Sequence, residues 1–138
     1  MNRVLCRLVM TVMVGSQIYS SPGFSQVSPT TKKAANVRIT KEPEIERNDF
    51  VVILRWTSNN PGGSPEHYGI VHYGISPKEL NQIAKSPIRL NPGHSETIFR
   101  VRIDDLKPRT TYYYMVDSME ANGNSDGVKD TIHHFTTQ

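Results

Sequence analysis

Five histidines are the side chains of this 138-residue sequence best suited to chemistry, because imidazole binds transition metals and exchanges protons near neutral pH. His67 and His72 lie near or on one predicted strand, His94 in a turn, and His133 and His134 on the last strand. Adjacent strand residues point to opposite faces, so His133 and His134 cannot both ligate one ion without a bulge. Catalytic zinc needs three convergent ligands and an open position, which this spacing does not predict.

The methionines of the sequence make copper an alternative to zinc as the metal. His72 and His134 with Met115 or Met119 offer the ligand types of a copper site. No fixed spacing links these residues. A small His/Met metal carrier is therefore the third hypothesis for function, and no cofactor or metal is predicted.

The segment "NGNSDG", residues 122–127, matches the front of a calcium-binding loop. Asn122, Asn124 and Asp126 stand at alternate positions and Gly127 stands sixth. His133 occupies the position of the bidentate glutamate. Since Asn, Asp and Gly are also the residues that tight turns need, a turn explains the pattern better than calcium.

Three arginines are the candidates for binding. Arg55, Arg100 and Arg102 are expected to project outward from neighbouring strands of one sheet, with Arg38 beside them. Such a strip would attract an acidic polysaccharide, lipid head groups or an acidic protein. A solvated face that discourages edge pairing is the other interpretation.

Sequence motifs for catalysis are missing. No nucleophile elbow, glycine-rich phosphate loop or His–carboxylate metal motif occurs. Glu42, Glu44 and Glu46 alternate as a polar strand edge would. The sequence predicts that the chain is not an enzyme.

The elements that position these residues are short strands separated by turn signals. Apolar alternation favours Val52, Leu54 and Trp56 facing the core with Phe50. The expected strands occupy residues 36–40, 50–57, 67–74, a short segment within 75–86, 97–103, 111–118 and 131–137. This pattern is typical of an all-β sandwich.

The stretch "LKPRTTYYYMV", residues 106–116, carries a recognisable spacing. Leu106, Pro108, Thr110 and Tyr112 follow an L-x-P-x-T-x-Y pattern. This pattern resembles the corner motif of fibronectin type III domains, and Trp56 is similar to their core tryptophan. The resemblance covers about residues 37–138 and extends to bacterial members and to the sandwich domain that precedes the catalytic domain of purple acid phosphatases.

The resemblance implies a seven-stranded fibronectin type III or immunoglobulin-like β-sandwich. Tyr112 is expected to be structural, its phenol reaching an upstream backbone group while its ring packs in the core. Alternation places Tyr114 inward and leaves Tyr113 outward as a candidate binding residue. In the phosphatases the metal-binding residues belong to the following catalytic domain, so no catalytic residue carries over.

The first 25 residues have the order of a secretory signal peptide. Arg3 and Arg7 precede the apolar run 8–15, and small residues precede an expected cleavage after Ser25, with Ser16 as the alternative. The run is shorter than the roughly 20 residues of a spanning helix. Cleavage would remove Cys6, the single cysteine, and leave 14 basic and 13 acidic residues, too balanced for nucleic-acid binding.

The sequence thus predicts a signal peptide at residues 1–25, a flexible linker at 26–36 and one sandwich domain at 37–138. We expect a secreted or periplasmic monomer, without a membrane span after cleavage. Its function is that of a non-catalytic binding or spacer module that contacts a protein or glycan at the cell envelope. The alternative is an accessory domain of a metallophosphatase-like enzyme carried on another chain.

Overall fold

The computed structural model describes residues 32–48 and 51–138, and this part of the chain is all-β. The predicted β-sandwich is confirmed. The predicted signal peptide lies outside the described residues, as does most of the predicted linker. No described helix is long and apolar enough to cross a membrane. The strands are β1 (Ile39–Asn48), β2 (Val51–Asn59), β3 (Glu66–Gly74), β4 (Gln82–Arg89), β5 (Glu96–Ile103), β6 (Thr111–Glu120) and β7 (His133–Thr136).

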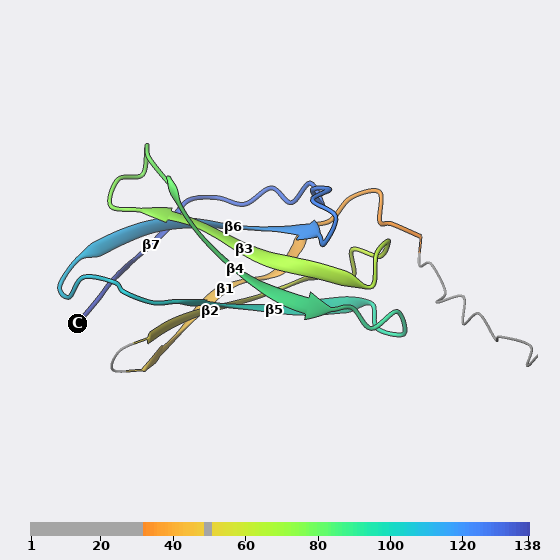
Figure 1. Ribbon diagram of the computed structural model, residues 1–138, viewed down its shortest axis with the longest axis horizontal. Helices are drawn as coiled ribbons and strands as arrows, with labels where there is room; N and C mark the ends of the chain where they lie inside the picture. Colours follow the sequence, from red (N-terminus) through yellow and green to blue (C-terminus); the bar gives the residue numbers. More distant parts are fainter. Residues whose placement is uncertain (1–31, 49–50) are drawn as a thin grey trace, which may run out of the picture.

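Two antiparallel sheets form the layers of the sandwich. One has the strand order β1-β2-β5 and the other β4-β3-β6-β7. Figure 1 shows these layers, with residues 32–36 and the loops that follow β2, β4 and β6 gathered at one end. The C-terminus lies at the opposite end. Residues far apart in sequence therefore meet at the end that holds residues 32–36.

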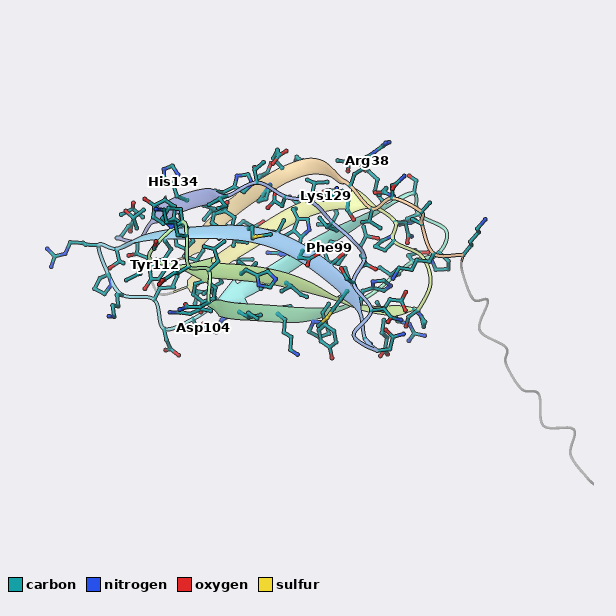
Figure 2. The ribbon with its side chains drawn as sticks, turned by 90° about the horizontal axis from the view of Figure 1, so that it is seen from above. Arg38, Phe99, Asp104, Tyr112, Lys129 and His134 are labelled. Atoms are coloured by element: carbon teal, nitrogen blue, oxygen red, sulfur yellow. The ribbon has the colours of Figure 1, made fainter. Side chains whose placement is uncertain are left out.

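The core lies between the sheets and follows the alternation of the sequence. The rings of Trp56 on β2 and Phe99 on β5 stack with centroids 5.3 Å apart, and Phe99 lies in the middle of the sandwich (Figure 2). Gly69 on β3 makes room for them, because a Cβ there would lie only 3.0–3.1 Å from atoms of Phe99, Trp56 and Val101. The core side chains are Val52, Leu54, Trp56, Val71, Phe99, Val101, Ile103, Tyr112, Tyr114, Val116 and Phe135.

The first strand is longer than expected. The sequence predicted a strand at residues 36–40, whereas β1 runs from Ile39 to Asn48 and pairs with β2 along its length, with irregularities near Lys41. Glu42, Glu44 and Glu46, which alternate as a polar strand edge would, belong to this strand, since β1 lies at a sheet edge where polar residues face solvent. Ile39 and Ile45 still pack against the core from this strand.

The tyrosine of the corner motif bonds to the backbone as described for such corners. The Tyr112 hydroxyl accepts a hydrogen bond of 3.0 Å from the backbone N–H of Lys107. Its ring is buried and stacks on Phe135 with centroids 5.7 Å apart. Leu106 packs against the core beside it. This contact ties the β5–β6 connection to the sheet that contains β6.

Stability is expected to fall at alkaline pH because of Tyr114. Burial, with the charges of Asp130 and Glu42, raises the pKa of the Tyr114 phenol to about 12 from 10.0. A raised pKa favours the neutral phenol, so its contribution is complete below pH ~10 and is lost as pH rises towards ~12. The rise of the pKa from 10.0 to about 12 corresponds to a loss of roughly 3 kcal/mol in the free energy of unfolding.

Urea unfolding followed by circular dichroism from pH 8 to 12 measures this loss. Tyr114→Phe should have a markedly flatter alkaline profile, because the phenylalanine ring does not ionise. Identical alkaline profiles for the two proteins would contradict the assignment. Tyr113→Phe, in a less buried position on the same strand, is the matched control.

Candidate functional site

The three arginines predicted as a binding strip lie on the outer face of the three-stranded sheet. Arg55 and Arg100 are direct partners across β2 and β5, and Arg102 lies opposite Ile53. Figure 2 shows the Arg38 side chain pointing away from the sandwich. Arg55, Arg100 and Arg102 therefore lie on the outer face, where alternation along the strands places them.

Each of the three arginines has an acidic partner that the sequence analysis did not assign. Arg100 forms an ion pair with Glu46 on β1. The Nη1 atom of Arg55 lies 3.7 Å from Oε2 of Glu44. The Nε atom of Arg102 lies 2.7 Å from Oδ1 of Asp104. The strip is therefore a face of mixed charge, which attracts an acidic ligand less than free arginines would. The pairs are exposed, so each stabilises the fold by only about 0–1 kcal/mol.

The outer face of the four-stranded sheet has a different chemistry. Its outward side chains are held in register across β4, β3 and β6, so that His72 lies between Ile83 and Met115. The face, called the apolar face below, comprises Tyr68, Ile70, His72, Ile83, Lys85, Pro87, Tyr113, Met115, Asp117, Met119 and His134. Within this set the formal charges are Lys85 and Asp117, and the exposed cross-strand pair Glu66 and Arg89 adds two opposite charges at the end of the same sheet face.

A groove of about 530 Å³ runs over the apolar face. Its lining consists of Ile70, His72, Ile83, Lys85, Asp117, Met119, Gly123 and Ser125. Ile83 is 61% exposed at its wall. The β6–β7 loop supplies Gly123 and Ser125, so the groove is bounded by a loop at one end and open along the strands.

The two charged groups of the apolar face are both engaged within it. The Lys85 ammonium lies over the Tyr68 ring, 5.3 Å from its centroid. Burial raises the pKa of the Asp117 carboxyl above its usual value, against opposing effects from the Ser118 N–H bond and His72.

Tyr113, the exposed tyrosine of the sequence analysis, belongs to the apolar face. Its ring packs against His134, with centroids 6.0 Å apart, and Figure 2 shows His134 at the end of the sandwich that holds Tyr112. Tyr113 is half-buried. It therefore extends this surface onto β7.

A second, polar groove of about 730 Å³ lies along β5. Arg55, Arg89 and His94 line it together with Glu96. These side chains would suit an acidic glycan, which keeps Arg55 as a candidate for such a ligand.

The histidines do not gather at one place. His133 and His134 face opposite sides of β7, opposite Tyr114 and Tyr113 respectively. His72 pairs with Met115, but Met119 lies opposite Tyr68 and His134 lies on another strand. Strand β6 therefore lies between His72 and His134, with Met115 beside His72 on the same sheet face.

Side chains of the segment 122–127, which resembles a calcium-binding loop, form hydrogen bonds within the protein. Asp126 points inward, and its Oδ2 lies 2.8 Å from Nδ1 of His67. Asn122 Oδ1 accepts the N–H of Asn124, 2.9 Å away. The oxygens expected to converge on an ion serve the turn and the buried His67 instead.

A known protein family matches most of this chain. Residues 36–137 match the family model for the purple acid phosphatase N-terminal domain. The chain belongs to this family. The resemblance to the phosphatase sandwich domain is thereby confirmed, while the resemblance to fibronectin type III stays a prediction. The family is that of an accessory domain, which agrees with the prediction of a non-catalytic chain without proving it.

Solved structures similar to this member of the purple acid phosphatase N-terminal domain family are distant. The sensor domain of the anti-sigma factor RsgI4 from Pseudobacteroides cellulosolvens is 18% identical, with a TM-score of 0.45, over 74% of this chain and 87% of that one. OgpA from Akkermansia muciniphila is 18% identical, with a TM-score of 0.43, over 80% of this chain and 31% of that one. The search of curated proteins gave no match.

Sequence reasoning missed the apolar face, although β3 carried a signal for it. Residues 99–103 of β5 alternate between inward apolar side chains and outward arginines, whereas β3 has apolar or aromatic residues at both parities. Tyr68 and Ile70 lie on the outer side of β3, although both are large side chains with much apolar surface, and Val71 lies on the inner side. A strand that is apolar on both faces is typical of one covered on both sides.

Proposed function

We propose that this chain is a non-catalytic accessory domain that acts outside the cytoplasm and contacts a protein through the apolar face. The observation that supports the proposal is the contrast between the two outer faces. One carries paired arginines and glutamates, and the other carries a groove lined by Ile70, Ile83 and Met119 among others. The predicted signal peptide at residues 1–25 supports the location.

A protein partner suits the apolar face better than a glycan does. Interface cores are enriched in tyrosine, methionine and other large apolar side chains and depleted of charge. Tyr68, His72 and Ile83 offer such side chains on two neighbouring strands. Glycan contact, the other option of the sequence analysis, would use the polar groove beside Arg55 instead.

Family membership favours a second, more specific candidate. The matched family takes its name from a domain of purple acid phosphatases. On this hypothesis the protein that covers the apolar face is a metallophosphatase-type catalytic domain, and the present chain supports it without reacting with its substrate.

The test is cross-linked capture from envelope and secreted fractions of the source cell. The altered bait carries His72→Glu and Ile83→Glu, which place two carboxylates on a cross-strand pair of the apolar face. We expect it to lose at least ~10-fold of the partner that the unaltered chain captures, since interface hot spots contribute about 2 kcal/mol or more. The matched control is Arg100→Glu with Arg102→Glu, which should capture normally.

Two results would contradict the proposal. Equal capture by the apolar-face variant, with unchanged circular dichroism, would remove the apolar face from binding. Loss of capture by the arginine variant alone would move the site to the charged face. Phosphatase activity that co-elutes with the unaltered chain and is absent from the apolar-face variant would support the catalytic-domain partner.

A further inference from the structure

A buried cluster of ionisable groups lies at the end of the sandwich that holds residues 32–36, beside the β6–β7 loop that bounds the groove of the apolar face. His67 is the second residue of β3, Glu120 ends β6, and Asp126 lies in the β6–β7 loop. Lys33 reaches them from the segment that precedes β1, and its Nζ lies 2.9 Å from Glu120 Oε1. Four separate parts of the chain therefore converge on this cluster.

The cluster is closed to solvent except near Lys33. The side chains of His67 and Asp126 have no exposed surface, and that of Glu120 is 9% exposed. The Lys33 side chain is 35% exposed. Removal or movement of this one side chain would open the carboxylates to an ion from solvent.

Lys33 holds the position that a metal ion would take. Its Nζ bonds the Ser125 carbonyl at 3.0 Å as well as Glu120, and it lies 3.6 Å from Asp126 Oδ1. Asp126 Oδ1 is buried and has no hydrogen-bond partner among the described residues. The ammonium thus leaves unsatisfied an oxygen that a bound ion would reach, and buried groups of this kind are rarely left unpaired.

The His67 ring is oriented as metal-binding imidazoles are. Its Nε2 lies 3.0 Å from the Gly62 carbonyl, which can only accept, so Nε2 carries a hydrogen. A backbone carbonyl on the distal nitrogen is a common support for a metal-ligating histidine. The other nitrogen, Nδ1, points at Asp126 Oδ2 from 2.8 Å.

We propose that His67 Nδ1, Glu120 and Asp126 form a binding site for one divalent zinc-type cation, which displaces the Lys33 ammonium. The ligand atoms of these three residues lie within 4.8 Å of one another. One imidazole with two carboxylates is a ligand set that zinc accepts, with a fourth position for water or the Ser125 carbonyl.

The exchange balances the charge of the buried site. Without a metal, Glu120 and Asp126 face the Lys33 ammonium, and one hydrogen lies between His67 Nδ1 and Asp126 Oδ2, since the other ring nitrogen donates its own hydrogen to Gly62. The entering ion brings two positive charges, displaces the ammonium and releases this proton to solvent. The net charge inside the sandwich is unchanged, which avoids the cost of a buried uncompensated charge.

Metal binding is thereby linked to the segment before β1. Lys33 and Ala34 attach this segment to the sandwich, the latter through an N–H bond of 2.7 Å to the Pro61 carbonyl. When the ion replaces Lys33, one of these attachments is lost. The site would therefore respond to zinc by loosening the chain ahead of β1.

The experiment is a zinc titration of the chelator-treated full chain by calorimetry, with three variants. Lys33→Met removes the competing ammonium and should tighten zinc binding at least tenfold. Glu120→Gln should weaken it at least tenfold. Glu42→Gln alters a separate group of potential ligands, Glu42, Asp130 and His133, and should leave the affinity unchanged.

Nitrogen-15 NMR of the histidine rings identifies the ligand directly. Zinc should shift the Nδ1 signal of His67, and it should raise the melting temperature of Lys33→Met more than that of the unaltered chain. The proposal is overturned if Lys33→Met binds zinc no tighter than the unaltered chain. It is also overturned if Glu42→Gln, and not Glu120→Gln, abolishes binding.

Discussion

Replacement of Trp56 by alanine is expected to lower the free energy of unfolding by about 3–5 kcal/mol. The Trp56 side chain is 1% exposed and stacks on Phe99 from the paired strand. Its ring also packs against the backbone of Gly69 in the opposite sheet. Alanine would leave a cavity at the point where the two sheets meet, and the rigid strands around it cannot collapse to fill it.

Replacement of Trp56 by phenylalanine distinguishes the contribution of ring packing to stability from that of the indole N–H. The Trp56 Nε1–H is buried with no hydrogen-bond partner among the described residues. Trp56→Phe removes this unsatisfied donor and keeps an aromatic ring on Phe99, so we expect a loss below about 2 kcal/mol.

Urea unfolding followed by circular dichroism measures both variants, with the m-value as a check on two-state behaviour. Equal losses for alanine and phenylalanine would show that the indole N–H contributes to stability through a partner. A loss below about 1 kcal/mol for alanine would contradict the central place of Trp56 in the core.

Replacement of Asp126 by alanine is the second large effect, with an expected loss of about 3–5 kcal/mol. The Asp126 carboxylate accepts the hydroxyl of Ser118 at 2.7 Å and faces His67 Nδ1 at 2.8 Å. Alanine would leave the His67 ring and the Ser118 hydroxyl buried without this acceptor. Asp104→Ala, which removes an exposed partner of Arg102, is the matched control and should cost less than about 1 kcal/mol.

The effect of Asp126 depends on pH in a defined direction. Burial raises the pKa of the Asp126 carboxyl, but hydrogen bonds from His67 and Ser118, with the Lys33 charge, bring it below its ordinary value of 3.8. A lowered pKa means that the stabilisation is complete above the unfolded-state value and is lost as pH falls through the folded-state value.

Urea midpoints at pH 7 and below pH 3 test this sign. The unaltered chain should lose stability on acidification more steeply than Asp126→Ala. An alanine variant that is as stable as the unaltered chain at pH 7 would show that the buried cluster contributes nothing to the fold.

The apolar face depended on which sheet each strand joined. From the sequence, Ile83 lay in a segment expected only as a short strand or edge. In the structure it stands beside His72 because β4 pairs with β3 along eight residue pairs. Cross-strand neighbours are set by register, which one strand's own sequence does not contain.

The pairing of the arginines was hidden for a similar reason. Their outward direction follows from alternation on β2 and β5. Two of their acidic partners, Glu44 and Glu46, come from β1, whose full length and pairing with β2 were not predicted, and the third, Asp104, follows β5. The net charge of a sheet face depends on the side chains of all its strands. The sequence of one strand therefore does not give the sign of that charge.

What the sequence determined by itself was local: the seven-stranded class, the inward side chains and the tyrosine of the corner. These follow from side-chain alternation and from a motif of seven residues, and both are encoded within a single strand and its turn. Only the tertiary structure decided which loops meet at the ends of the sandwich. Lys33 and Glu120, 87 positions apart, become ion-pair partners because sheet order brings the start of the domain against the β6–β7 loop, a long-range contact that no local pattern specifies.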